Sequence, residues 1–290
     1  MRLGTVVVAL RVRQWVKNLV VLSPLIFSGW LFEPWAFISA CVAFGCFCLA
    51  SSGAYLLNDV LDWRIDRFHP LKKTRPVASG KLPLRQATVI SALLMGAAVA
   101  AGWRIHPRLG EVLAFYLALN IAYSVLLKRV VVLDVVVLAM GFVLRVWGGS
   151  VVLDIVPSHW LQLSMFFLAL FLGLTKRRQE LVILHARALR HRRVLSDYSP
   201  AFIDQLTSIL TAVAILCYAL YAVSPDVTRR VGQFGFIYTV PVVIYAIFRY
   251  LYLVHIRKEA LDPTEALLCD QPLALSVVVW IALILLVLYR

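Results

Sequence analysis

Charged residues are scarce in this chain, since Asp, Glu, Lys and Arg together make up only 15% of its 290 residues. Hydrophobic residues make up 62%, and the mean hydropathy is +0.86. A soluble domain carries about 25% charged residues, so this balance excludes an ordinary soluble fold. The composition predicts a polytopic membrane protein.

Cysteine is also rare, and the five cysteines show no Cys-x-x-Cys spacing, so we predict neither a disulfide framework nor a zinc site. The six histidines have no ligand spacing. The chain lacks a Walker loop, a dinucleotide fingerprint and a Ser-His-Asp arrangement. The sequence therefore does not require a covalent nucleophile.

Long apolar runs follow one another along the chain. Each is near the roughly 20 residues that cross a bilayer as a helix, whereas barrel strands alternate over about 10 residues. We predict an all-α membrane helix bundle of about nine transmembrane helices, in a single domain over residues 1–290 with cytoplasmic loops at about 58–85 and 176–204. The expected spans are about 18–33, 35–57, 86–105, 109–127, 130–152, 159–175, 205–224, 234–254 and 272–289.

The net charge of +14 is unevenly placed. Basic residues gather in the N-terminal segment and in the two long polar segments, which the positive-inside bias assigns to the cytoplasm. This predicts a protein integral to the bacterial inner (plasma) membrane, with its N-terminus inside and its C-terminus outside. The same placement explains the charge without nucleic acid, so we expect membrane lipids as partners.

One dense block of charge occupies residues 58–76, directly after an apolar run. If the helix continues past this run, Asn58, Asp62 and Asp66 share one face, with Asp59 beside them. Such oxygen ligands suit Mg²⁺, or Mn²⁺, and Mg²⁺ usually takes one or two carboxylates plus substrate phosphates. The basic residues that follow are Lys72, Lys73 and Arg75. The block predicts an enzyme that acts on a phosphorylated substrate; the alternative is a loop of mutually neutralised charges.

A second cluster follows the sixth apolar run and contains Lys176, Arg177 and Glu180. On a helix Glu180 lies four residues after Lys176 and three after Arg177, so its carboxylate can orient both cations. The alternative is ordinary anchoring of a membrane helix by basic residues.

Ionisable residues also lie inside the fifth run, where they are rare and usually face a cavity or a partner. Asp134 is near its cytoplasmic end, and Arg145 lies roughly 16 Å deeper on the same face, so the two should not pair. Arg145 has the alternative role of a structural hydrogen-bond anchor. Tyr123 and Lys128 end the fourth run and can point to the same cytoplasmic cavity.

The N-terminal segment brings Gln14 and Lys17 to one side of an interfacial helix. We treat both as candidates for binding a substrate phosphate. The alternative is an amphipathic membrane anchor, in which Trp15 is a belt residue.

The motif Asn58-Asp59-x-x-Asp62-x-x-x-Asp66 in a nine-span bundle resembles the UbiA superfamily of intramembrane prenyltransferases. The resemblance covers nearly the whole chain and implies one catalytic membrane domain. Typical members carry a second DxxxD motif after the sixth span, and this chain has Lys176-Arg177-x-x-Glu180 there instead.

That replacement is similar to one branch of the superfamily, the decaprenyl-phosphate phosphoribosyltransferases. The extension His69-Pro70-x-Lys72-x-x-Arg75-Pro76, the opening Arg11-x-Arg13-Gln14-Trp15-Val16-Lys17-Asn18 and the segment from Tyr123 to Asp134 also resemble it. The resemblance implies transfer of 5-phosphoribose from phosphoribosyl pyrophosphate (PRPP) to a polyprenyl phosphate, for cell-wall arabinan synthesis.

Two other functions stay open from the residues. A prenyltransferase would move a polyprenyl group from its diphosphate to an aromatic or glycerol acceptor, and it should carry the second acidic motif. A transporter would use Asp134 and Arg145 as pathway residues, but the spans show no matching pair of broken helices.

Overall fold

The computed structural model describes residues 3–68, 72–184, 197–232, 234–257 and 263–289, and every regular element in them is a helix. The all-α prediction is therefore confirmed. The long helices are α3 (Pro34–Asp66), α4 (Leu84–Ile105), α5 (Pro107–Val125), α6 (Leu133–Val151), α7 (His159–Leu184), α9 (Pro200–Ala222), α11 (Val240–His255) and α13 (Gln271–Leu288). The short ones are α1 (Leu3–Ala9), η1 (Val12–Leu22), α2 (Ser23–Phe27), η2 (Lys72–Thr74), η3 (Leu127–Arg129), α10 (Pro225–Val231), η6 (Ile237–Thr239) and α12 (Pro263–Cys269).

Local sequence explains where several long helices begin. Pro34, Pro107 and Pro200 stand in the first turn of their helices, where a missing N–H costs nothing. The Ser199 hydroxyl accepts a hydrogen bond from a backbone N–H of α9, and the Asp270 carboxylate does the same for α13. These caps satisfy N–H groups that have no partner inside the helix.

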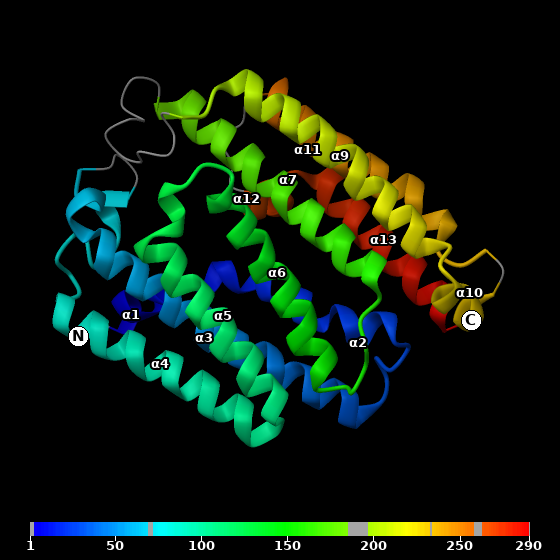
Figure 1. The fold of residues 1–290 in the computed structure, drawn as a ribbon, viewed down its shortest axis with the longest axis horizontal. Coiled ribbons are helices and arrows are strands. Elements are labelled where there is room, and N and C mark those ends of the chain that lie inside the picture. Colours follow the sequence, from blue (N-terminus) through cyan, green and yellow to red (C-terminus); the bar gives the residue numbers. More distant parts are fainter. Residues whose placement is uncertain (1–2, 69–71, 185–196, 233, 258–262, 290) are drawn as a thin grey trace.

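The long helices form two groups that lie side by side in Figure 1. Helices α3, α4, α5 and α6 surround a core that includes Phe47 and Leu113. Helices α7, α11 and α13 share another core around Phe171 and Leu273. A third cluster joins α6 to α7 and α9, so the two groups pack into one bundle.

The segment expected as the first membrane helix differs from the prediction. Residues 18–33 do not form one helix; η1 and α2 divide the segment, and a turn follows at Gly29, whose φ is +81°. Pro24 lies in the first turn of α2, where it interrupts the backbone hydrogen bonds of the preceding element. The segment η1 instead packs against α6 so closely that a Cβ on Gly149 would lie 1.9 Å from the carbonyl oxygen of Val21.

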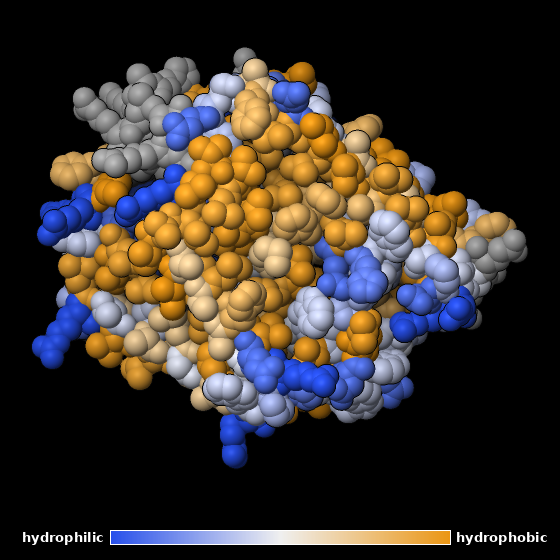
Figure 2. Space-filling model, viewed as in Figure 1, coloured by the Kyte–Doolittle hydropathy of each residue, from blue (hydrophilic) through white to orange (hydrophobic). Residues whose placement is uncertain are grey.

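On the face shown in Figure 2, the middle of the bundle is apolar and hydrophilic residues gather toward its two ends. Six helices of the described part are long and apolar enough to cross a bilayer: α3, α4, α6, α9, the run from η6 through α11, and α13. The predicted count of nine is therefore not confirmed.

Helices extend into both polar segments that were expected as loops. Helix α3 continues to Asp66, since residues 58–66 contain neither proline nor glycine. Helix α7 likewise continues to Leu184, and α9 begins at Pro200. The acidic motif therefore stands on the same helix as the apolar run before it. The His69-Pro70 pair of the extension lies outside the described residues.

Candidate active site

The acidic residues of the first motif occupy the last three turns of α3. Asp59 and Asp66 are buried, and Asn58 and Asp62 are partly exposed. The spacing of four residues between Asn58, Asp62 and Asp66 places them on one side of the helix, as expected.

Each carboxylate of the motif meets a cation from another segment. Lys128 Nζ lies 2.6 Å from Asp62 Oδ1, and Arg75 Nη1 lies 2.6 Å from Asp66 Oδ2. Arg75 Nη1 also lies 3.0 Å from Asp59 Oδ1, so one guanidinium holds two carboxylates. These cations offset the repulsion between neighbouring carboxylates.

Arg11 is a further cation of this cluster, although it was not among the predicted site residues. Its Nη2 forms an ion pair with Asp59 Oδ1, and its guanidinium lies over the ring of Tyr55, 5.2 Å from the centroid. Burial lowers the pKa of Arg11, while the charge of Asp59 opposes this shift. Arg11 and Asp59 are 48 positions apart, so no local spacing relates them. The only signal for Arg11 in the sequence is its place in the basic opening motif at residues 11–18.

Two side chains of the motif, Asn58 and Asp62, share one cation. Lys128 Nζ lies 3.4 Å from Asn58 Oδ1 as well as 2.6 Å from Asp62 Oδ1. Across the described ranges, no three His, Cys, Asp or Glu side chains gather as in a metal site made by protein alone. Mg²⁺ usually needs only one or two protein carboxylates, with substrate phosphates and water completing its shell. The donor set therefore fits a magnesium ion shared with a phosphorylated substrate.

The second cluster is organised around Arg177, which is buried toward the C-terminal end of α7. Its Nε donates to Asp134 Oδ2 at 2.8 Å, and its Nη1 donates to Glu180 Oε2 at 2.9 Å. Its Nη2 lies 3.4 Å from the Tyr123 hydroxyl. The expected orientation of Arg177 by Glu180 is confirmed. Arg177 thereby joins α5, α6 and α7.

Tyr198 completes this cluster, although nothing in its sequence neighbourhood indicated a role. Its hydroxyl donates to Asp134 Oδ1 at 2.9 Å and accepts from the backbone N–H of Val132 at 2.7 Å. Val132 has a φ of +66°, so the Tyr198 contact holds an unusual backbone conformation just before α6. Burial and the Asp134 carboxylate raise the pKa of Tyr198 above its ordinary value.

Arg145 forms a third network, and it binds different partners from Asp134, as the spacing predicted. Its guanidinium is 4% exposed and donates to Asn18 Oδ1, to the Gly141 carbonyl and to the Tyr116 hydroxyl, each at 2.8 Å. Asn18 in turn donates to the Ser51 hydroxyl at 3.0 Å. The network ties η1 to α3, α5 and α6, which is the arrangement expected of a structural anchor.

The remaining candidates lie around these clusters. Gln14 and Lys17 are half-buried on η1, and Lys17 directly precedes Asn18. Lys72 and Lys73 belong to η2, where Lys73 is exposed, and Lys176 precedes Arg177 on α7. Their roles in binding substrate stay predictions.

The family model for UbiA prenyltransferases matches residues 19–269 of this chain. The chain belongs to the UbiA family. As a UbiA protein it is a transferase and an integral membrane protein, which confirms the resemblance seen in its motifs.

Curated relatives extend over most of the chain. A decaprenyl-phosphate phosphoribosyltransferase of Mycolicibacterium smegmatis is 35% identical over 95% of this chain and 90% of its own length. The protein of that name from Corynebacterium glutamicum is 30% identical, over 97% and 86%. Among solved structures, a UbiA homologue from Archaeoglobus fulgidus bound to GPP and Mg²⁺ has a TM-score of 0.72 at 16% identity, and the match covers 99% of this chain and 100% of that one. This last similarity concerns the fold.

Proposed function

We propose that this UbiA protein transfers 5-phosphoribose from PRPP to a polyprenyl phosphate such as decaprenyl phosphate, with release of pyrophosphate. The 35% identity to a decaprenyl-phosphate phosphoribosyltransferase supports this activity. We further propose that the site faces the cytoplasm and that its product supplies a lipid-linked sugar precursor of cell-wall arabinan.

The observation that carries the proposal is the buried guanidinium of Arg177 in the second cluster. Where typical relatives have a second acidic motif, this chain has Arg177 held by Asp134 and Glu180. The first motif is itself surrounded by Arg11, Arg75 and Lys128, as described above. PRPP and a lipid phosphate bring three phosphorylated groups to one site, which favours one acidic cluster among many cations.

We assign metal binding to Asn58, Asp62 and Asp66. The oxygens of Asn58 and Asp62 lie near Lys128 Nζ, and Asp66 also pairs with Arg75. Mg²⁺, or Mn²⁺, would supply positive charge to the departing pyrophosphate. Asp59 and Asp66 keep Arg75 in place, so that its remaining N–H groups can bind phosphate oxygens.

The other candidates divide between the two substrates. We propose that Lys72, Lys73, Lys128, Lys176 and Arg177 bind the phosphate groups of PRPP, and that Gln14 and Lys17 bind the lipid phosphate. Asp134, Tyr123 and Glu180 orient Arg177 through the contacts described above. Arg145 positions η1 through its hydrogen bond to Asn18, and η1 carries Lys17.

In the proposed reaction, an oxygen of the lipid phosphate attacks C1 of the ribose. The bond from C1 to the lipid phosphate oxygen forms, and the bond from C1 to the pyrophosphate oxygen breaks. The attacking phosphate is already an anion at neutral pH, so no general base is needed. The rate enhancement then comes from positioning the two substrates and from electrostatic stabilisation of the transition state. Attack opposite the leaving group inverts C1 and yields a β-linked product.

The test is pyrophosphate release by the purified protein with Mg²⁺, comparing two substrate pairs. PRPP with decaprenyl phosphate should release pyrophosphate and give a phosphoribosylated lipid by mass spectrometry. Release only from a prenyl diphosphate with 4-hydroxybenzoate would overturn the proposal and favour a prenyltransferase. Solute flux into proteoliposomes without pyrophosphate release would instead indicate a transporter.

A further inference from the structure

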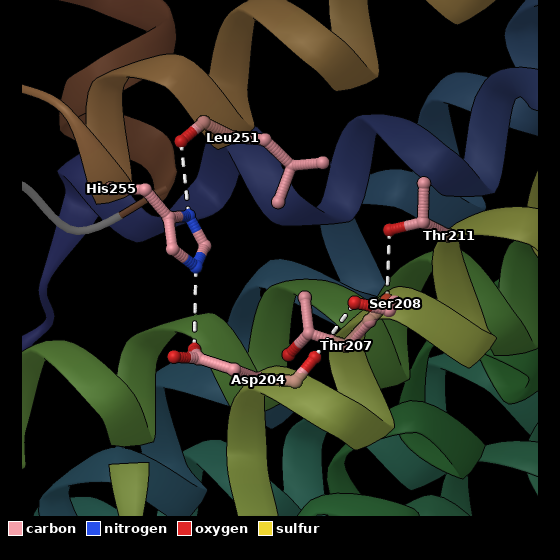
Figure 3. A pocket seen from close by; sticks show the side chains of 6 residues that line it. All are labelled: Asp204, Thr207, Ser208, Thr211, Leu251 and His255. Atoms are coloured by element: carbon pink, nitrogen blue, oxygen red, sulfur yellow. Dashed lines mark hydrogen bonds and ion pairs between the residues drawn. The ribbon is translucent and has the colours of Figure 1, made fainter. Parts of the chain in front are cut away.

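The hydroxyl group of Tyr198 joins parts of the chain that are far apart in sequence. Many hydroxyl groups of the structure bond within their own helix instead. In Figure 3, for example, Ser208 Oγ and Thr211 Oγ1 on α9 donate to backbone carbonyls four residues earlier. The Tyr198 hydroxyl bonds to groups 64 and 66 positions away, just before and at the start of α6. It therefore fixes tertiary structure that no local hydrogen bond provides.

The backbone at residues 131–133 forms a γ-turn at one of these places. The backbone N–H of Leu133 donates to the carbonyl of Val131 at 2.7 Å, and Val132 between them has φ +66° and ψ −44°. A γ-turn with a positive central φ is rare and strained. The strain is larger for a β-branched residue such as valine, whereas glycine adopts a positive φ readily. Strained conformations persist only where the surrounding structure holds them, and they cluster at functional sites.

Hydrogen bonds to Tyr198, rather than packing of the valine, hold this turn. The Tyr198 hydroxyl accepts from the backbone N–H of Val132 at 2.7 Å and donates to Asp134 Oδ1 at 2.9 Å. The Val132 side chain is 39% exposed, so it packs against little. The ring of Tyr198 is buried in the cluster that joins α6 to α7 and α9. One buried side chain thus connects the strained turn to the body of the bundle.

The turn lies between two cationic parts of the proposed active site. Lys128 is four residues before Val132, and its Nζ lies 2.6 Å from Asp62 Oδ1. Asp134 is two residues after Val132, and its Oδ2 lies 2.8 Å from Arg177 Nε. A change in the backbone angles of the turn would swing the segment that carries Lys128 relative to α6. The turn therefore sets where Lys128 stands relative to Arg177.

We propose that Tyr198 is a positioning residue for the binding of a diphosphate group. Its hydroxyl keeps Val132 in the γ-turn, and the turn places Lys128 and Arg177 so that both reach the same diphosphate. This inference rests on the proposed function, because it takes both cations to bind phosphate. Tyr198 acts through the backbone of the turn and needs no contact with the substrate.

The first test measures binding of inorganic pyrophosphate with Mg²⁺ to the full-length protein in detergent, by calorimetry. Tyr198→Phe keeps the ring and removes both hydrogen bonds, so it should weaken pyrophosphate binding about tenfold. Tyr218→Phe is the matched control, because it also removes two hydrogen bonds from a buried tyrosine, far from the turn in the cluster around Phe236. Its pyrophosphate affinity should be that of the wild type. Unchanged binding in Tyr198→Phe, or an equal loss in Tyr218→Phe, would overturn the proposal.

Pyrophosphate is the probe because PRPP and a prenyl diphosphate both carry a diphosphate group. The expected pattern of binding without any turnover of PRPP would overturn the phosphoribosyl transfer and leave the role of Tyr198 standing. A wild-type protein that does not bind pyrophosphate would overturn the role of Tyr198 as well, since Lys128 and Arg177 would then not form a diphosphate site.

A second substitution separates the turn from the other contact of Tyr198. In the Tyr198→Phe protein, Val132→Gly should restore pyrophosphate affinity to within about threefold of the wild type, because glycine adopts a positive φ without a steric cost. Val132→Ala shortens the side chain as well but keeps the Cβ, so it should not restore binding. Restoration by neither substitution would show that Tyr198 acts through Asp134 alone, and equal restoration by both would also overturn the proposal.

The strain itself can be measured with Tyr198 intact. Val132→Gly should melt at a higher temperature than Val132→Ala, which reverses the usual order of these two residues, since alanine is destabilising where φ is positive. The Val132 side chain is exposed, so both substitutions lose little packing. A Val132→Ala protein that melts at or above the temperature of Val132→Gly would overturn the strained turn and the role of Tyr198 with it.

Discussion

Asp134 and Arg177 form a buried ion pair, and replacing Asp134 by Ala should strongly destabilise the protein. The Asp134 side chain is fully buried and Arg177 is 2% exposed, so water cannot replace the lost carboxylate. Removing one partner of a buried pair costs about 3–5 kcal/mol. Glu180 remains 2.9 Å from Arg177 Nη1, so the lower end of this range applies. We expect the free energy of unfolding to fall by about 3 kcal/mol.

The assay is equilibrium unfolding in detergent micelles, followed by circular dichroism. Asp134→Asn should lower the free energy of unfolding less than Asp134→Ala, because the Asn amide oxygen can still accept a hydrogen bond from the Tyr198 hydroxyl. Asp226→Ala is the control; Asp226 is exposed on α10, so its loss should change stability by no more than about 0.5 kcal/mol. A loss below about 1 kcal/mol in Asp134→Ala would refute the view that this pair holds α6 to α7.

Three further changes test other parts of the molecule. Asp62→Asn should lower turnover about 100-fold or more in the pyrophosphate-release assay, and near-normal turnover would contradict the metal assignment. Gly149→Ala should lower the melting temperature by several degrees, because its Cβ would lie 1.9 Å from the Val21 carbonyl oxygen; an unchanged value would contradict the close packing of η1. Arg249 holds the pKa of Asp270 below its ordinary value by hydrogen bonding. The stabilisation from Asp270 should therefore be present at neutral pH and be lost as pH falls below about 4, so wild type and Asp270→Asn should differ in melting temperature at pH 7 and converge in acid.

The fold class and the acidic motif on α3 could be predicted because both depend on local patterns. Apolar runs identify membrane helices, and a spacing of four residues places Asn58, Asp62 and Asp66 on one face whatever the helix packs against. Glu180 could be paired with Arg177 for the same reason, since the two are three residues apart on α7.

Other parts of the site could not be predicted because they depend on distant segments meeting. Lys128 and Asp62 are separated by 66 residues, and Tyr198 and Asp134 by 64. No periodicity in the sequence relates such pairs. The expected helix over 18–33 was also wrong. That prediction used only the length and apolarity of the segment, whereas the path of η1 also depends on the hydrogen bond from Arg145 on α6 to Asn18.

The sequence by itself determined the class of this protein: a helical membrane bundle of the UbiA kind, with an acidic helix end and cationic helix ends. Composition and helical periodicity are sufficient for the helical membrane bundle, and the motif at residues 58–66 carries the resemblance to the UbiA family. Only the tertiary structure decided which cation meets which carboxylate, how η1 enters the bundle, and that the Tyr198 hydroxyl holds the turn before α6. Those features depend on the packing of whole helices, in which burial and hydrogen bonding between remote residues select one arrangement.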